Sequence, residues 1–441
     1  MLHIYKKLAR VLGTFGLAAI VGLVAGCGGG GGGSGSSSSG GSTNGSTSNS
    51  GGGSTSIVAT GPVSSTPATL ASNQAAVVVS SVTGTPNLPM VSVTICQHGT
   101  STCETIDNVQ LDTGSYGLRL VKDTMLTALP TETVGGQSVA ECASFADGFS
   151  WGSVRTADVQ IGGETASNIP IQILGDVPQS EAGGSNNSCA TGTLNDTLSQ
   201  LHANGILGIG TAKYDCGTNC TSAPNDVYYG CTSSCTDLAL SAVTQEVGNP
   251  VRFFATDNNG VVLNMPVVSS SGATSASGVL NFGIGTETNN TVPSSGIQTV
   301  TTDHFGDVSS ASLNGSTYSD SSSFERAAFF DTGSNGLFFP DTSITLCAGG
   351  GGFYCPASAV SLQPSVTGFN TTTASISMSV QNAFDLVDGG GYAFNNLGGT
   401  ADGLLAIDFG MPFFYGRTVY INYDPNTDGS LGTGTTAYVA F

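Results

Sequence analysis

The sequence contains the nonapeptide QLDTGSYGL at Gln110–Leu118 and a second copy of its pattern, FFDTGSNGL, at Phe329–Leu337. In both copies an apolar residue precedes Asp-Thr-Gly-Ser, and a Gly-Leu pair follows one residue later. A single such tetrapeptide would be weak evidence in a chain with 64 Gly, because it could simply be a turn. The matching neighbours indicate a true internal repeat. Its two aspartates, Asp112 and Asp331, are 219 residues apart, which suits two similar lobes.

Two aspartates brought together by such loops would form an acid–base pair. Carboxyl groups about 3 Å apart cannot both ionise cheaply, so they share one proton. The ionised member can draw a proton from a bound water while the protonated member polarises a carbonyl. Asp112 and Asp331 are therefore the candidate catalytic residues. The residues expected to support them, through tight turns and hydroxyl hydrogen bonds, are Thr113, Gly114, Ser115, Thr332, Gly333 and Ser334.

The rest of the body has the pattern of a β protein. From about Ala75 onward, short runs rich in Val, Ile, Thr and Phe, such as Val91–Ile95, alternate with Gly, Asn, Asp and Ser. Asp257–Gly260 predicts a hairpin turn between two of these runs. Helical patterns are scarce, and Asp237–Glu246 is the best candidate. The sequence therefore predicts a mostly-β body.

At the two Asp loops the sequence resembles the pepsin-like aspartic peptidases, and the similarity continues in order over roughly residues 76–441. Phe145–Gly152, followed by Ala157–Gly163, resembles the family's flap and its return strand. Gly205–Gly210 resembles the apolar segment that passes under the first Asp loop, and Asp408–Phe414 resembles the closing segment. The sequence is also similar to a group of uncharacterised exported bacterial lipoproteins of that fold with LDTGS–GLR and GMPFFYGR motifs.

This resemblance implies a bilobal, mostly-β fold whose lobes, residues 76–248 and 249–441, are related by a pseudo-two-fold axis around a central cleft. It implies an aspartic-type endopeptidase. A peptide or protein substrate would lie in the cleft, and water activated between Asp112 and Asp331 would hydrolyse it without a cofactor or a metal.

The flap differs from the family pattern. Its residues expected to contact substrate are Phe145, Asp147, Gly148 and Trp151. The position that usually holds Tyr falls on Phe145, so the flap hydroxyl is missing. Trp151, the only Trp, either compensates in part or packs the hairpin. Arg119 replaces the Trp expected after the first Asp loop, and either changes the side of the cleft that receives a substrate side chain or is a solvated charge.

Three functions remain open on this sequence. Retention of both Asp-Thr-Gly-Ser loops favours the endopeptidase. The changes at Phe145 and Arg119 favour a binding protein of the same fold with a silent cleft, recognising a polysaccharide or a partner protein. A structural lipoprotein of the cell envelope is the third reading.

The first 26 residues predict a lipoprotein signal peptide. Basic residues in the first ten precede an apolar run, Val11–Ala25, which at about 15 residues is shorter than the roughly 20 of a membrane-spanning helix. The run ends in Val-Ala-Gly before Cys27, which resembles the bacterial lipobox, where the chain is cut and the Cys thiol receives a lipid. Residues 27–75 would then be the lipidated Cys27 and a Gly/Ser-rich tether that cannot bury a core.

This predicted signal peptide and lipidation site imply an exported protein that is attached to a membrane through its lipid. Gly28 after Cys27 favours the outer membrane or the cell surface, with a periplasm-facing body as the alternative. The composition excludes a nucleic-acid partner, because 30 acidic residues against 10 basic ones give a net charge of −20 that repels phosphates.

The ten cysteines after Cys27 form an even set, which in an exported chain predicts five disulfides. Cys96 with Cys103, and Cys347 with Cys355, would each close a short loop. A zinc site is the alternative for the remaining cluster with two CxxxC spacings, namely Cys216, Cys220, Cys231 and Cys235.

Other metal patterns are weaker. Asp424–Gly429 matches the start of a calcium loop, but Thr435 stands where the bidentate Glu belongs. The remaining His residues, His98, His202 and His304, are too scattered to indicate a His metal site or a Ser–His–Asp triad.

Overall fold

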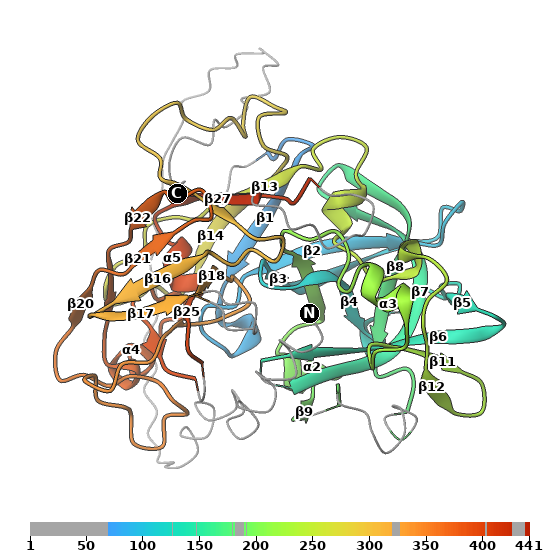
Figure 1. The fold of residues 1–441 in the computed structure, drawn as a ribbon, viewed down its shortest axis with the longest axis horizontal. Coiled ribbons are helices and arrows are strands. Elements are labelled where there is room, and N and C mark those ends of the chain that lie inside the picture. Colours follow the sequence, from blue (N-terminus) through green and yellow to red (C-terminus); the bar gives the residue numbers. More distant parts are fainter. Residues whose placement is uncertain are drawn as a thin grey trace, which may run out of the picture.

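The computed structural model describes residues 69–125, 127–146, 148–178, 180, 189–190, 192–319, 327–401, 404–425 and 437–441. In these ranges the chain is mostly β, as the sequence predicts (Figure 1). The longest helix there, α4 (Ala383–Asp388), has six residues. None of the helices in this part of the chain has the length and apolar character needed to cross a membrane.

The largest sheet in the described part of the chain has 17 strands. They are β1 (Gln74–Val79), β2 (Met90–Cys96), β3 (Cys103–Asp112), β4 (Tyr116–Val121), β5 (Thr133–Val134), β6 (Gln137–Phe145), β7 (Gly148–Ile161), β8 (Glu164–Leu174), β9 (Thr193–Leu194), β10 (Gly205–Ile209), β11 (Tyr228–Cys231), β12 (Cys235–Asp237), β13 (Gly260–Asn264), β14 (Ala276–Phe282), β15 (Thr299–Thr302), β26 (Thr418–Asn422) and β27 (Ala437–Ala440).

Three smaller sheets are made from the later part of the chain. Their strands are β16 (Ser310–Leu313), β17 (Ser316–Ser319), β21 (Ser365–Thr367) and β22 (Thr373–Ser375); β18 (Ala328–Phe330), β19 (Leu337–Phe338), β24 (Gly398–Gly399) and β25 (Ile407–Phe409); and β20 (Val360–Leu362) with β23 (Met378–Val380). The other α-helices are α2 (Leu198–Leu201), α3 (Thr218–Ser222) and α5 (Met411–Phe414).

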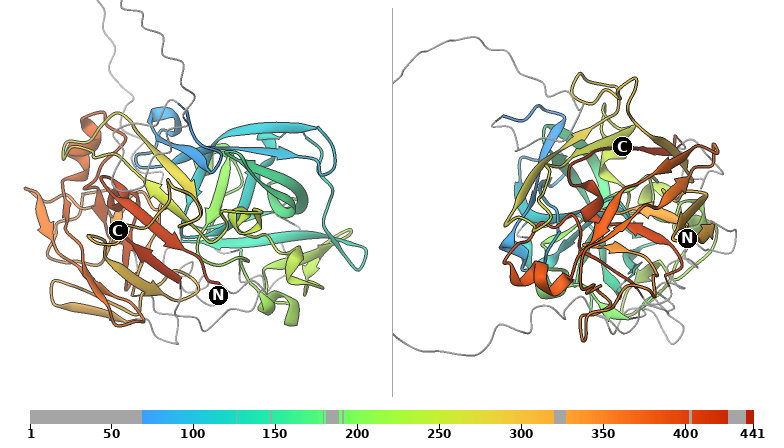
Figure 2. Two further views of the ribbon diagram at one scale, coloured as in Figure 1. Left: turned by 90° about the horizontal axis from the view of Figure 1, so that it is seen from above. Right: turned by 90° about the vertical axis from the view of Figure 1, so that its left-hand side faces the viewer.

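The first and second halves of the described chain gather on different sides of the molecule, blue to green against yellow to red in the left view of Figure 2. Strand β1 joins them, because it pairs antiparallel with β14, from Gln74 opposite Asn281 to Val79 opposite Ala276. Alternate β1 side chains, including Val77 and Val79, are fully buried in the main core. The N-terminal strand is therefore held by packing as well as by its backbone ladder.

Each Asp-Thr-Gly-Ser loop connects two strands that a third strand holds together. Strand β10 is parallel to β3 and antiparallel to β4, and Gly208 lies opposite Asp112 in the register. Strand β25 is likewise parallel to β18 and antiparallel to β19. A Cβ atom on Gly208 would lie 2.7 Å from the backbone of Tyr116, so the close approach of β10 to the first loop requires Gly at this position.

Two local predictions are wrong. Residues 237–246 do not form an α-helix, because Leu238 N donates to Tyr228 O and Leu240 N to Cys220 O, and only a 3₁₀ turn forms at Val243–Gln245. The apolar run before Asp257–Gly260, Val251–Phe254, is not a strand either. Asn249 accepts a hydrogen bond from Val251 N and, with the following Pro, starts a 3₁₀ turn at Pro250–Phe253.

All ten cysteines after Cys27 pair in five disulfides, as predicted, and the two expected short-loop pairs are among them. The zinc alternative is wrong, because Cys216 bonds to Cys220 and Cys231 to Cys235. The remaining bridge, Cys142–Cys189, ties β6 to a segment 47 residues later and belongs to a small core that includes Phe149 and Trp151 of β7.

Candidate active site

The two Asp loops are locked together by their threonines. Thr113 Oγ1 donates to Phe330 O at 2.9 Å, and Thr332 Oγ1 donates to Leu111 O at 2.7 Å. The backbone N–H of Thr332 donates to Thr113 Oγ1 at 2.9 Å, and that of Thr113 donates to Thr332 Oγ1 at 3.1 Å. Both threonines are buried, so these four bonds are shielded from water and fix the spacing of the loops.

The carboxyl groups of Asp112 and Asp331 receive matching hydrogen bonds from the residues that follow them. Gly114 N donates to Asp112 Oδ1 at 2.7 Å, and Gly333 N donates to Asp331 Oδ1 at 2.7 Å. Ser115 Oγ donates to the other oxygen of Asp112, and Ser334 Oγ donates to Asp331 Oδ2 at 3.0 Å. All six predicted supporting residues therefore lie in contact with a loop or a carboxylate of this pair.

The two carboxyl groups face each other across the loops. Burial, and next the charge of Asp331, raise the pKa of Asp112 well above its usual range. Asp112 is only 7% exposed, so water screens this repulsion weakly. A pair with this geometry holds one proton over a wide pH range and can act as acid and base together.

A third carboxyl group belongs to the same hydrogen-bond chain. Ser334 Oγ lies 2.6 Å from Asp408 Oδ2 as well as 3.0 Å from Asp331 Oδ2. One hydroxyl hydrogen cannot serve both contacts, so one of these carboxyl groups must carry a proton for both bonds to form. Asp408 lies on β25 opposite Phe329 of β18, and this register brings it beneath the second loop.

The segment predicted to be the flap forms the hairpin of β6 and β7, in which Phe145 pairs with Gly148. A Cβ atom on Gly148 would lie 2.0 Å from Thr193 O, so Gly is required where β9 approaches the hairpin. Asp147 lies outside the described residues. Trp151 is fully buried and packs edge-to-face on Tyr229 at 5.2 Å, so its ring packs the base of the hairpin rather than facing a substrate.

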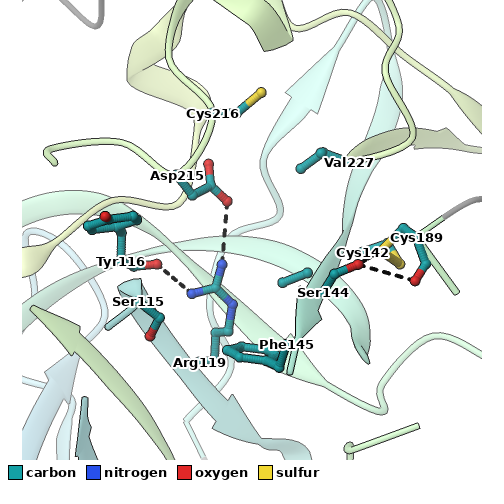
Figure 3. A pocket seen from close by; sticks show the side chains of 11 residues that line it. Ser115, Tyr116, Arg119, Cys142, Ser144, Phe145, Cys189, Asp215, Cys216 and Val227 are labelled. Carbon is teal, nitrogen blue, oxygen red and sulfur yellow. Dashed lines mark hydrogen bonds and ion pairs between the residues drawn. A yellow bond between two sulfur atoms is a disulfide. The ribbon is translucent and has the colours of Figure 1, made fainter. Parts of the chain in front are cut away.

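A pocket opens beside Ser115, between the first Asp loop and the flap (Figure 3). Its lining is mostly apolar, with Phe145 and one buried cation, Arg119, on its walls (Figure 3). The residues that line it are Ser115, Tyr116, Arg119, Cys142, Ala143, Ser144, Phe145, Cys189, Asp215, Cys216 and Val227.

One of the two roles predicted for Arg119, that of a solvated charge, is wrong, because the residue is only 2% exposed. Its guanidinium donates to Tyr116 O at 2.5 Å and to Glu141 Oε1 at 2.5 Å, and lies 3.4 Å from Asp215 Oδ2. Burial and the Glu141 carboxylate raise the pKa of Asp215 well above its usual range, and burial raises that of Glu246 to about 8.

The described residues include no group of three or more His, Cys, Asp or Glu side chains arranged to hold a metal ion. His98 pairs with Asp158 at 2.7 Å on the surface. Most of the calcium-like loop after Asp424, and the lipidation residue Cys27, lie outside the described part of the chain.

Comparison with curated proteins returns no match. Among solved structures, the aspartic proteinase from Irpex lacteus is similar at 14% identity and a TM-score of 0.43, over 83% of this chain and 96% of that one. A family model described as "Protein of unknown function (DUF3443)" matches residues 69–441. Because this match spans most of the sequence, the chain belongs to the DUF3443 family.

Proposed function

We propose that this protein is an aspartic-type endopeptidase that hydrolyses peptide bonds with water activated between Asp112 and Asp331. The observation that carries the proposal is the reciprocal bonding of Thr113 and Thr332, which holds two equivalently hydrogen-bonded carboxyl groups together. Structural packing alone does not call for a buried carboxyl group, that of Asp112, facing a second carboxyl group, because burying such a charge costs free energy.

The reaction follows from the shared proton. The ionised carboxyl takes a proton from a water bound between the two aspartates, and the water oxygen bonds to the substrate carbonyl carbon. The protonated carboxyl gives its proton to the carbonyl oxygen, which produces a neutral tetrahedral intermediate. The C–N bond then breaks: the leaving nitrogen takes the proton of the protonated carboxyl, and the ionised carboxyl takes a proton from one hydroxyl of the intermediate, which becomes the carbonyl of the product acid. The pair is then singly protonated again.

Residues 76–248 and 249–441 are proposed as the two lobes, related by a pseudo-two-fold axis, with the peptide or protein substrate in the cleft between them. The paired β3–β10–β4 and β18–β25–β19 units support this division. The pocket beside Ser115 would receive one substrate side chain.

A silent binding protein on the same fold is the second candidate. The observation that favours it is Phe145, whose ring offers no hydroxyl to a substrate at the flap. Such a protein would bind a polysaccharide or a partner protein in the same cleft without cleaving it.

The first test is digestion of an unstructured protein by the purified chain from about pH 3 to about pH 8. We expect cleavage with a maximum below neutrality, because raising the pH removes the shared proton and lowering it protonates the second carboxyl. A statine-containing peptide should inhibit it. Absence of both cleavage and statine binding at every pH would contradict the proposal and favour the binding protein.

We also propose that the chain is an exported lipoprotein anchored through Cys27 in the outer membrane or at the cell surface, or facing the periplasm. The five disulfides support an oxidising compartment. Cys27→Ser should leave an uncleaved or soluble precursor, whereas the wild type should partition into detergent and incorporate labelled fatty acid. Wild-type protein that takes up no label would contradict the anchor.

A further inference from the structure

No backbone ladder in the described structure pairs the strand of Arg119 directly with the flap strand β6, and the two are linked through β8 and β7. Arg119 lies on β4, which pairs with β8 and β10, whereas the flap strand β6 pairs with β5, β7 and β11. The Arg119 side chain spans this gap. Its guanidinium bonds to Glu141 of β6 on one side and to the Tyr116 carbonyl on the other.

Both ends of this link lie close to the proposed chemistry. Tyr116 directly follows Ser115, whose hydroxyl donates to Asp112. Glu141 is four residues before Phe145, the last residue of β6, and the Phe145 ring lies 5.8 Å from the guanidinium carbon. Figure 3 shows the guanidinium between Asp215, the Tyr116 backbone and Phe145, on the wall of the pocket.

The charges around Arg119 make the link stiff. The side chains of Arg119 and Glu141 are 3% and 0% exposed, so neither can exchange its partner for water without opening the structure. Asp215 is held in turn by the hydroxyl of Tyr228 at 2.9 Å, and Glu246 accepts the backbone N–H of Gly217 at 2.7 Å. The guanidinium is planar and always charged, so its donors keep fixed directions.

We propose that Arg119 is a positioning residue that holds the flap hairpin, β6 with Gly148–Trp151 of β7, against the Asp112 loop. Through Glu141 and Phe145 it sets where the flap lies, and through Tyr116 it sets where the loop lies. Its effect on catalysis rests on the proposed function, but its anchoring of the flap does not.

The test compares Arg119→Met, Arg119→Lys and Glu141→Gln by hydrogen–deuterium exchange. Arg252→Met is the matched control, because Arg252 is also buried, donates to a backbone carbonyl, Thr211 O, and lies over a ring, that of Tyr423. We expect at least about tenfold faster exchange in the flap hairpin of Arg119→Met, partial recovery in Arg119→Lys, and an unchanged flap in the control.

Two further readouts separate positioning from general loss of structure. Trp151, the only Trp, lies opposite Cys142 in the hairpin, so acrylamide quenching should rise in Arg119→Met while the unfolding transition stays cooperative. The kcat/KM for a cleaved peptide should fall about tenfold or more in Arg119→Met, recover in part in Arg119→Lys, and stay near wild type in Arg252→Met.

Exchange that rises uniformly, or that stays at the wild-type level in the flap, would overturn the inference. A wild type that cleaves nothing would contradict the proposed function only, because exchange and quenching decide the anchoring without any substrate. Faster flap exchange with unchanged kcat/KM in an active enzyme would overturn the claim that Arg119 positions the flap for catalysis.

Discussion

Asp112→Asn and Asp331→Asn are each expected to reduce peptide cleavage by at least about a thousandfold, because a single carboxyl cannot serve as acid and base at once. Asn keeps the size of Asp and can still accept the N–H of the Gly two residues later. What it loses is the exchangeable proton. The measurement is kcat/KM for a cleaved peptide, with Asp385→Asn, at an exposed site on α4, as the control.

The Asp112→Asn variant should be more stable to unfolding than the wild type at neutral pH. A carboxyl whose pKa is raised in the folded state stabilises the fold below its unfolded pKa, and this contribution is lost as the pH rises through the folded value. Because the pKa of Asp112 is raised by burial and by Asp331, the wild type carries this cost at neutral pH and Asp112→Asn does not. Thermal unfolding should show a gain that shrinks on acidification.

These two results together identify the role of the pair. Asn variants that cleave as fast as the wild type would place the chemistry elsewhere. Variants that lose both activity and stability would indicate that the carboxyl groups serve the fold rather than the reaction.

The contact of the two Asp loops and the number of disulfides could be predicted because their signals are local. Each Asp carries its supporting Gly and Ser within three residues, and the repeat alone suggested that the two loops meet. The number of disulfides followed from the even count of Cys after Cys27 together with the predicted export of the chain. Such short-range patterns do not depend on knowing the register of any strand.

The role of Arg119 could not be predicted in the same way. Its partners Glu141 and Asp215 are 22 and 96 residues away, and no motif marks them. Asp408 reaches Ser334 over 74 residues, through the register of β25 on β18. From sequence alone a charged side chain is expected to be exposed to solvent, unless the strands that bury it are known. These contacts therefore become visible only when the pairing of the strands is known.

The second large loss of activity is expected on substitution of the glycines that face the Asp112–Asp331 pair. A Cβ atom on Gly333 would lie 2.6 Å from Asp112 Oδ1, and one on Gly114 would lie 2.6 Å from Asp331 Cγ. Contacts this short cannot persist, so Gly333→Ala and Gly114→Ala must push the opposite carboxyl away from its partner. A displacement near 1 Å in reacting groups costs about a hundredfold in rate, which is the fall in kcat/KM that we expect.

The expected loss of activity comes from steric crowding by the added Cβ and not from a strained backbone conformation. The control must therefore also be a glycine outside the left-handed region. Gly389→Ala meets this requirement, because Gly389 has φ −68°, is exposed at the end of α4, and its added Cβ would meet only helix carbonyl oxygens, the nearest being Leu386 O at 3.1 Å. It should leave kcat/KM near the wild-type value.

Because the crowding acts between the loops, Gly333→Ala should regain folding stability when combined with Asp112→Gly, without regaining activity. A Gly333→Ala protein that cleaves like the wild type would mean that the carboxyl groups are farther apart during the reaction than the shared-proton mechanism allows.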